Sequence, residues 1–100
     1  RFKLADMATE IEAARQLGDL AAEKFDRGER ADVEAGMAKL FASEMAHRQC
    51  WNAVQIHGGY GYTREYSVNR YWRDSGLLPI GEGTSEIQRE IIARRILQER

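Results

Sequence analysis

Apolar residues recur at helical spacing along nearly the whole chain. Over residues 1–25 they fall three or four positions apart and predict one stripe on a helix, which Asp26-Arg27-Gly28 would end. The stripe consists of Leu4, Met7, Ile11, Ala14, Leu17, Ala21 and Phe25. Because no Ser, Asp or Pro precedes this helix to cap its first turn, we expect the sequence to be cut from a larger protein.

A second apolar pattern predicts a helix from Asp32 to about His57. At 1.5 Å per residue it would be roughly 37 Å long. Asp32 is the predicted N-cap, because its carboxylate can accept a hydrogen bond from an unpaired backbone N–H, and Gly58-Gly59 would end the helix. The apolar side is formed by Val33, Met37, Leu40, Phe41, Met45, Trp51 and Val54.

A third, shorter helix is predicted from about Arg64 to Asp74. Thr63 would cap it, and Ser75-Gly76 would end it. The side chains expected to face inward are Val68, Tyr71 and Trp72. Residues 77–80 contain the only proline and predict an extended connector.

The last helix would begin at Thr84 or Ser85. Either hydroxyl suits an N-cap, and Ser85 followed by Gln88 matches a capping box. Its expected buried stripe is Ile87, Ile91, Ile92 and Ile96. The sequence shows no useful strand alternation and no internal repeat. We therefore predict an all-α fold, a single domain over residues 1–100 arranged as an antiparallel four-helix bundle.

The charge balance does not identify a partner. Lysine and arginine total 15 against 16 acidic residues, and neither sign forms a long block, so we expect no nucleic-acid partner. No apolar run approaches the roughly 20 residues that cross a bilayer, so we expect no membrane insertion. The single cysteine, Cys50, suits a reducing compartment such as the bacterial cytoplasm or the mitochondrial matrix.

Glycine is concentrated in two short stretches, QIHGGYGY over residues 55–62 and GEGTSEIQ over residues 81–88. Gly58-Gly59 with Gly61 is not a dinucleotide fingerprint, since that motif needs a preceding strand and here a long helix precedes it. A helix C-cap followed by a turn accounts for part of the pattern. Three glycines exceed what a cap requires, so a planar or phosphorylated ligand lying on the bare backbone beside Gln55 is the alternative.

Two other groups of side chains are candidates for a metal site or a reactive centre. In a continuous helix Cys50 and His57 lie about 10 Å apart along the axis, so with His47 they predict no metal site. Glu82 lies between Gly81 and Gly83 just before a helix begins. It could simply favour the helix N-terminus by about 0.3–1 kcal/mol. The glycines on both sides would also leave the Glu82 carboxylate accessible to a small reacting group. Stabilising the helix N-terminus does not require this access.

Three segments together resemble a known family. MAKLFASEMA, QIHGGYGYTREYSVNRYWRD and EGTSEIQREIIARRIL are similar to the C-terminal helical domain of the acyl-CoA dehydrogenases, flavoenzymes that desaturate acyl-CoA thioesters. The resemblance covers essentially the whole chain. It implies that the segments supplying most flavin and CoA contacts precede residue 1, so this chain alone should be inactive.

The resemblance assigns a role to each glycine stretch. Gln55, Gly58 and Gly59 would lie against the ADP half of FAD, usually an FAD bound mainly by another subunit. Glu82 would be the base that removes the thioester α-proton while a hydride leaves the β-carbon for the flavin. Beside it, Gly83 would approach the thioester, and Thr84, Ser85 and Glu86 would approach the flavin or its phosphates.

The same resemblance implies binding partners and leaves two alternative functions open. The expected partners are an acyl-CoA substrate, an electron-transfer flavoprotein and further copies of the chain in a dimer or tetramer. A non-catalytic helical module that self-associates is one alternative, and a related acyl-CoA oxidase is another. The chain departs from the common family pattern at Gly81, where an aromatic residue is usual, at Ser67, where proline is usual, and at Asn69, where an acidic residue is usual.

Overall fold

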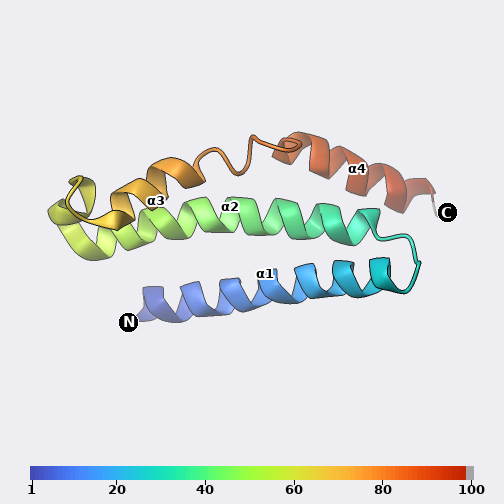
Figure 1. Ribbon diagram of the computed structural model, residues 1–100, viewed down its shortest axis with the longest axis horizontal. Coiled ribbons are helices and arrows are strands. Elements are labelled where there is room, and N and C mark those ends of the chain that lie inside the picture. Colours follow the sequence, from blue (N-terminus) through green and yellow to red (C-terminus); the bar gives the residue numbers. More distant parts are fainter. Residues whose placement is uncertain (99–100) are drawn as a thin grey trace.

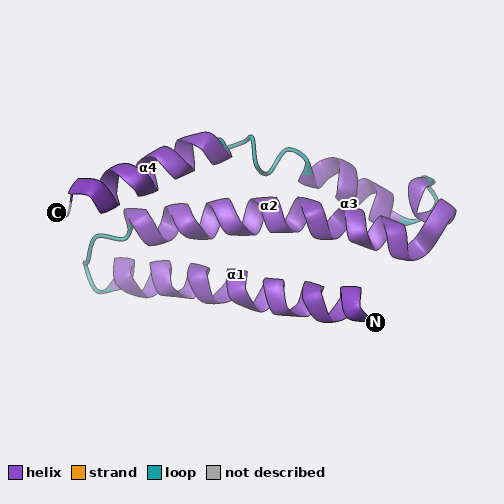
Figure 2. Ribbon diagram, turned by 180° about the vertical axis from the view of Figure 1, so that it is seen from behind, coloured by secondary structure: helices purple, strands orange, loops and turns teal. Residues whose placement is uncertain are grey.

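The computed structural model describes residues 1–98, which contain helices and turns and no strand (Figures 1 and 2). The helices are α1 (Phe2–Asp26), α2 (Asp32–His57), the 3-10 helix η1 (Gly58–Tyr62), α3 (Ser67–Ser75) and α4 (Ser85–Gln98). The predicted all-α fold with four main helices is confirmed. None of the helices in this range combines the length and the apolar character needed to span a lipid bilayer.

All other helices pack on α2. Helix α1 runs antiparallel along one side of it, and α3 and α4 follow one another along the other side (Figure 1). Within residues 1–98, α1 has no backbone neighbours in α3 or α4. The molecule is therefore elongated, with principal extents of 51 × 24 × 22 Å.

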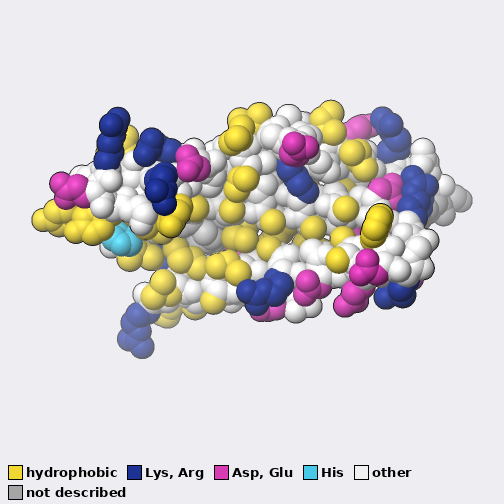
Figure 3. All heavy atoms as spheres, viewed as in Figure 1, with side chains coloured by type: hydrophobic (Ala, Val, Ile, Leu, Met, Phe, Trp, Pro, Cys, Tyr) yellow, Lys and Arg dark blue, Asp and Glu magenta, His cyan; other side chains and the backbone are white. Residues whose placement is uncertain are grey.

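Few large side chains are enclosed by this arrangement. Among apolar residues in the described range, only Met45 and Val54 are buried. Figure 3 shows hydrophobic side chains reaching the surface along most of one face. Phe2 and Phe25 at the two ends of α1 are 88% and 75% exposed. The chain thus presents large apolar surfaces that only another segment or another molecule could cover.

The predicted buried stripe of α4 is wrong for three of its four isoleucines. Ile87, Ile91 and Ile96 are all exposed. Ile92 does meet α2, and the other contacts on this face come from Gln88 and Arg95. The reason is close approach, because a Cβ atom on Gly36 of α2 would lie 3.3 Å from both the Gln88 and the Ile92 side chains. Similarly, Tyr71 was expected to face inward and is 52% exposed.

Three local predictions at helix starts are corrected. Asp32 is the first residue of α2 and Ala31 is its N-cap, because the Asp32 carboxylate accepts two hydrogen bonds from Arg30 at 3.0 Å. Helix α3 begins at Ser67. Thr63 does not cap it, since its hydroxyl donates to the Tyr60 carbonyl at 2.7 Å and closes η1.

The segment between α3 and α4 is compact, not extended as predicted. The N–H groups of Ile80 and Gly81 both donate to the Leu77 carbonyl, at 2.9 and 2.8 Å, and fold residues 77–81 into consecutive turns. Thr84 is the N-cap of α4, because its hydroxyl accepts a hydrogen bond from Ile87 N–H at 3.2 Å. The Ser85–Gln88 capping box does not form, and the Gln88 amide instead reaches the Glu82 carbonyl at 3.5 Å.

Two glycines of the first stretch are required by the fold. Gly58 ends α2 with φ of +64°, a conformation that side chains disfavour. Gly61 is buried against α2, where a Cβ atom would lie 2.4 Å from the Val54 carbonyl oxygen and 2.9 Å from the His57 Cβ. Gly59 has neither constraint, because its φ is unremarkable and a Cβ atom there would meet nothing within 4 Å.

These contacts predict that the same substitution has different effects at two nearby positions. Gly61→Ala should destabilise the protein by about 1–3 kcal/mol, because the added methyl overlaps the α2 backbone. Gly59→Ala is the matched control and should change stability by less than about 0.5 kcal/mol. Urea unfolding of the two variants measures both, and equal stability would contradict the observed packing of η1.

Charged side chains join α1 to α2. Lys24 Nζ donates to Glu34 Oε2 at 2.9 Å, and Arg48 bonds to Glu10 near the other end of the hairpin. The hydrogen bond from Lys24 is the main cause that lowers the pKa of Glu34 below its ordinary value. A carboxyl whose pKa is lower in the folded state stabilises the fold above its unfolded pKa. That contribution is lost as pH falls through the folded pKa.

Lys24→Met should raise the pKa of Glu34 toward its ordinary value and reduce the loss of stability on acidification below about pH 4.5. An NMR titration of the Glu34 side-chain carboxyl measures the change. Lys3→Met, at the opposite end of the same helix, is the control and should leave this titration unchanged. A Glu34 titration insensitive to Lys24→Met would show that the pair does not form in solution.

Candidate functional site

The loop before α4 has a strained backbone at its central acid. Glu82 has φ of +56° and is the only non-glycine residue with positive φ among residues 1–98. Gly83 beside it has φ of +91°. A left-handed conformation in a residue with a side chain costs about 1–3 kcal/mol and persists only where surrounding contacts enforce it. The loop therefore holds the exposed Glu82 in a defined bend.

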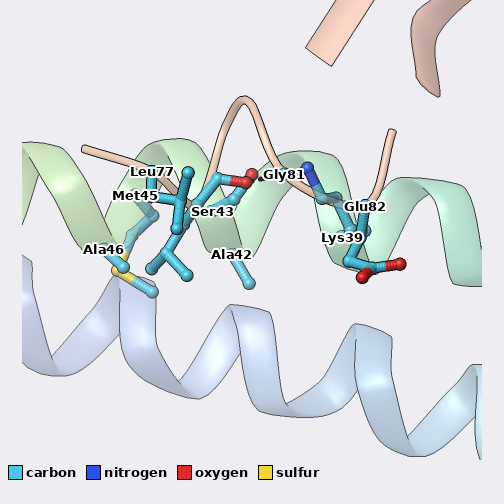
Figure 4. Close-up of a pocket in the computed structure, with 9 residues that line it drawn as sticks. Lys39, Ala42, Ser43, Met45, Ala46, Leu77, Gly81 and Glu82 are labelled. Carbon is cyan, nitrogen blue, oxygen red and sulfur yellow. Dashed lines mark hydrogen bonds between the residues drawn. The ribbon is translucent and has the colours of Figure 1, made fainter. Parts of the chain in front are cut away.

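Glu82 borders an open groove of about 500 Å³ between α2 and the loop. The other lining residues are Lys39, Ala42, Ser43, Met45, Ala46, Leu77, Leu78 and Gly81. Figure 4 shows Leu77, Met45 and Ala46 at one end and Lys39 and Glu82 at the other. The groove is thus apolar along its length, with Lys39 and Glu82 at one end.

Lys39 joins this loop to α2, and sequence reasoning missed it. Its Nζ donates to the carbonyl of Leu78 at 2.8 Å and to the carbonyl of Gly83 at 2.7 Å. Gly36, Lys39 and Ser43 are spaced three and four residues apart and so lie on one face of α2. A lysine within this row of small residues was the available signal.

The residues after Glu82 begin α4. A Cβ atom on Gly83 would lie 2.7 Å from Gln88 Nε2, so the fold itself favours glycine at this position. Thr84 is half-buried and caps the helix. The Ser85 hydroxyl is buried and has no hydrogen-bond partner, whereas Glu86 is exposed. A buried hydroxyl without a partner is uncommon and requires an explanation.

The other candidate residues lie at the C-terminal end of α2. Gln55, Gly58 and Gly59 are exposed, and a Cβ atom on either glycine would meet nothing within 4 Å. Gly58 is explained as the helix end and Gly61, as shown above, by close packing. Nothing in the fold requires glycine at position 59, so the interpretation as a simple helix cap does not account for it.

An aromatic cluster flanks this second set of residues. The Tyr66 ring centroid lies 5.8 Å from that of His57 and 5.9 Å from that of Tyr60. Tyr60 is 68% exposed next to Gly59. The backbone of Gly59 therefore lies next to the exposed ring of Tyr60. Helical periodicity did not predict this arrangement.

The two sets of residues do not come together. Lys39, which touches the Glu82 loop, and Gln55 are separated by 16 positions of one continuous helix. At 1.5 Å per residue this is about 24 Å. Figure 1 shows η1 at one end of the molecule and the loop before α4 near its middle. A small ligand that contacts Glu82 does not also reach Gly59 of the same chain.

The two histidines each make one contact within the fold, and Cys50 is a half-buried free thiol. His47 Nδ1 lies 3.0 Å from the Ser75 hydroxyl, and His57 Nδ1 lies 2.9 Å from the Ala53 carbonyl. Over residues 1–98 no group of three or more His, Cys, Asp or Glu side chains is arranged to hold a metal ion.

Comparison with known proteins gives consistent matches over the whole chain. The model of a family described as acyl-CoA dehydrogenase, C-terminal domain, matches residues 1–97. The probable acyl-CoA dehydrogenase YngJ of Bacillus subtilis (strain 168) is 58% identical over 98 residues, 98% of this chain and 26% of that protein. Subunit CarC of the caffeyl-CoA reductase-Etf complex of Acetobacterium woodii is 48% identical over 97 residues, 97% of this chain and 26% of that protein.

A solved structure agrees with these sequence matches. Butyryl-CoA dehydrogenase from Megasphaera elsdenii superimposes with a TM-score of 0.93 at 48% identity, over 96% of this chain and 25% of that one. The chain thus spans about a quarter of the length of the relatives it matches. Proteins of this family are flavoproteins. The matches, together with the four helices and two glycine stretches of this chain, place the chain in the acyl-CoA dehydrogenase family, in which it corresponds to the C-terminal domain.

Proposed function

We propose that this chain is the C-terminal part of an FAD-dependent acyl-CoA dehydrogenase and that Glu82 is its catalytic base. One observation carries the proposal: Glu82 is held in a strained bend between two glycines at one end of an apolar groove. A carboxylate in this position is open to a thioester whose acyl chain lies along the groove. The family relationship supports the same reaction class.

In the proposed reaction the Glu82 carboxylate takes the proton from the α-carbon of the acyl-CoA. FAD, when bound, supplies the acceptor for the hydride that leaves the β-carbon, so that a carbon–carbon double bond forms. Gly83 is the proposed thioester contact through its backbone, because the position of its missing side chain faces Gln88. Gly81 adds no side chain to the groove wall next to Glu82, so the groove stays open at this point.

The residues at the end of α2 fit the nucleotide half of FAD. Gly59 has open space where a side chain would be, and Gly58 presents bare backbone beside it. Gln55, one turn earlier, offers an amide that can both donate and accept hydrogen bonds. Because this group lies about 24 Å along α2 from the Lys39–Glu82 region, we assign it to an FAD other than the one beside Glu82. That assignment requires a homo-oligomer, a dimer or a tetramer.

The start of α4 fits contact with the flavin ring system. Ser85 is assigned here as well, but its hydroxyl is enclosed by this chain's own atoms and does not reach a flavin as the helix stands. Thr84 caps the helix through its oxygen and retains a hydroxyl proton to donate. Glu86 adds a negative charge to the first turn, so we favour the flavin ring over a phosphate as the neighbour of these residues.

Electron-transfer flavoprotein is the proposed electron acceptor. A relative that is 48% identical carries the name of a caffeyl-CoA reductase-Etf complex subunit. That name also indicates reduction, the reverse direction. By microscopic reversibility, a protonated Glu82 would return the proton to the α-carbon in that direction. The non-catalytic helical module is not favoured by these relatives, and a related oxidase would differ in its electron acceptor.

Glu82→Gln in the full-length enzyme should retain bound flavin and lose turnover by about 10²–10⁴-fold, because glutamine cannot accept the α-proton. Single-turnover bleaching of the flavin by acyl-CoA measures the loss. Glu90→Gln, an exposed acid on α4 paired with Arg94, is the matched control and should behave as wild type. Rapid bleaching in Glu82→Gln would refute the assignment of the base.

Gly59→Leu in the same enzyme should weaken FAD binding at least about tenfold, because the side chain fills the space assigned to the nucleotide. Equilibrium titration of the flavin-free enzyme with FAD gives the affinity. Gly18→Leu on α1, where a side chain also meets nothing within 4 Å, is the control and should leave the affinity unchanged. Wild-type affinity in Gly59→Leu would remove this residue from the FAD site.

A further inference from the structure

The contacts of Lys39 suggest a role beyond joining two elements. One ammonium nitrogen binds the carbonyls of Leu78 and Gly83, at 2.8 and 2.7 Å. These carbonyls stand on either side of Glu82, five residues apart in the sequence. Lys39 therefore closes the loop around the position of Glu82 and does not merely touch one edge of it.

The charge of Lys39 is directed to the backbone. Within the described residues its ammonium makes no ion pair, and the Glu82 carboxylate lies beyond ion-pair distance of it. Hydrogen bonds from a charged donor to carbonyl oxygens are stronger than those between neutral groups. These two bonds are also the hydrogen bonds that tie the backbone of residues 77–83 to α2.

The loop needs such a restraint because its backbone is strained. The positive φ of Glu82 is disfavoured for any residue with a side chain, and it persists only if contacts on both sides enforce it. Other bonds act within the loop or from α4. Ser85 N–H donates to the Pro79 carbonyl at 3.0 Å, and the Gln88 amide reaches the Glu82 carbonyl at 3.5 Å. Neither of them is a hydrogen bond between the loop and α2.

We propose that Lys39 is a positioning residue, which holds the 78–83 backbone so that Glu82 keeps its place at one end of the groove. The catalytic part of this inference rests on the proposed function, and the structural part does not. Its ammonium would touch neither substrate nor flavin. It acts by fixing the bend from which Glu82 projects, and α2 provides the rigid support.

The test is Lys39→Met in the full-length enzyme, since methionine keeps the apolar stem and removes the donor. We expect kcat to fall by about 10- to 100-fold, because a base displaced by about 1 Å loses much of its effect. KM for acyl-CoA and flavin content should change less than about threefold. Amide hydrogen exchange in residues 77–88 should accelerate at least about tenfold, while exchange in α1 stays as in wild type.

Lys24→Met is the matched control, because it removes a lysine that binds Glu34 and not the loop. It should leave kcat and exchange at residues 77–88 unchanged. If Lys39→Met does not fold, Lys39→Gln replaces it as the test variant. Its amide can donate to one of the two carbonyls, so we expect kcat and the exchange rate at residues 77–88 to lie between those of wild type and of a variant with no donor.

Wild-type kcat or wild-type exchange at residues 77–88 in the folded Lys39 variant would overturn the inference. This result is distinct from failure of the proposed function. If Glu82→Gln turns over normally, Glu82 is not the base, yet accelerated exchange in Lys39→Met still shows that the lysine restrains the loop. If Glu82→Gln is inactive and Lys39→Met has wild-type kcat and exchange, the assignment of Glu82 as the base is supported and the positioning role of Lys39 is refuted.

Discussion

Packing against α2 is the constraint on which the rest of the structure depends. Helices α1, α3, α4 and η1 each contact α2, and α1 has no backbone neighbour in α3 or α4 within the described range. A central helix that is covered from opposite sides needs small residues where its neighbours approach most closely. Gly36 meets α4 in this way, and Gly61 of η1 folds back onto the end of α2 at a distance that admits no side chain.

The same arrangement leaves much apolar surface uncovered. Buried apolar residues are limited to Met45 and Val54 in the described part of the chain, while three of the four isoleucines of α4 and both phenylalanines of α1 are exposed. Burial of apolar area is the dominant favourable term in folding, so a chain with this little enclosed area depends on further contacts for much of its stability. The proposed oligomer and the remainder of the enzyme would supply such contacts.

Sequence reasoning succeeded where structure is local. The spans of α1 and α2 follow from helical periodicity ended by Gly28 and Gly58, and Glu82 was singled out because glycines flank it. It failed where contacts between residues far apart in the sequence determine the structure. Periodicity identifies an apolar face of α4 but not which side meets α2, and the Thr63 hydroxyl binds η1 instead of capping α3. Lys39 was missed because its partners lie 39 and 44 positions away.

The continuous α2 also sets the geometry between the two proposed sites. One part of the helix carries Lys39 and thereby the Glu82 loop, and its end carries Gln55 and the bare backbone of Gly58 and Gly59. An α-helix turns 100° per residue and rises 1.5 Å, so the two parts keep both a fixed distance and a fixed relative direction. The proposed base of one active centre and the proposed nucleotide contact of another would then be aligned by one rigid element. Because the proposed reaction needs the flavin as hydride acceptor as well as the base, α2 would tie the position of Glu82 to that of a neighbouring FAD.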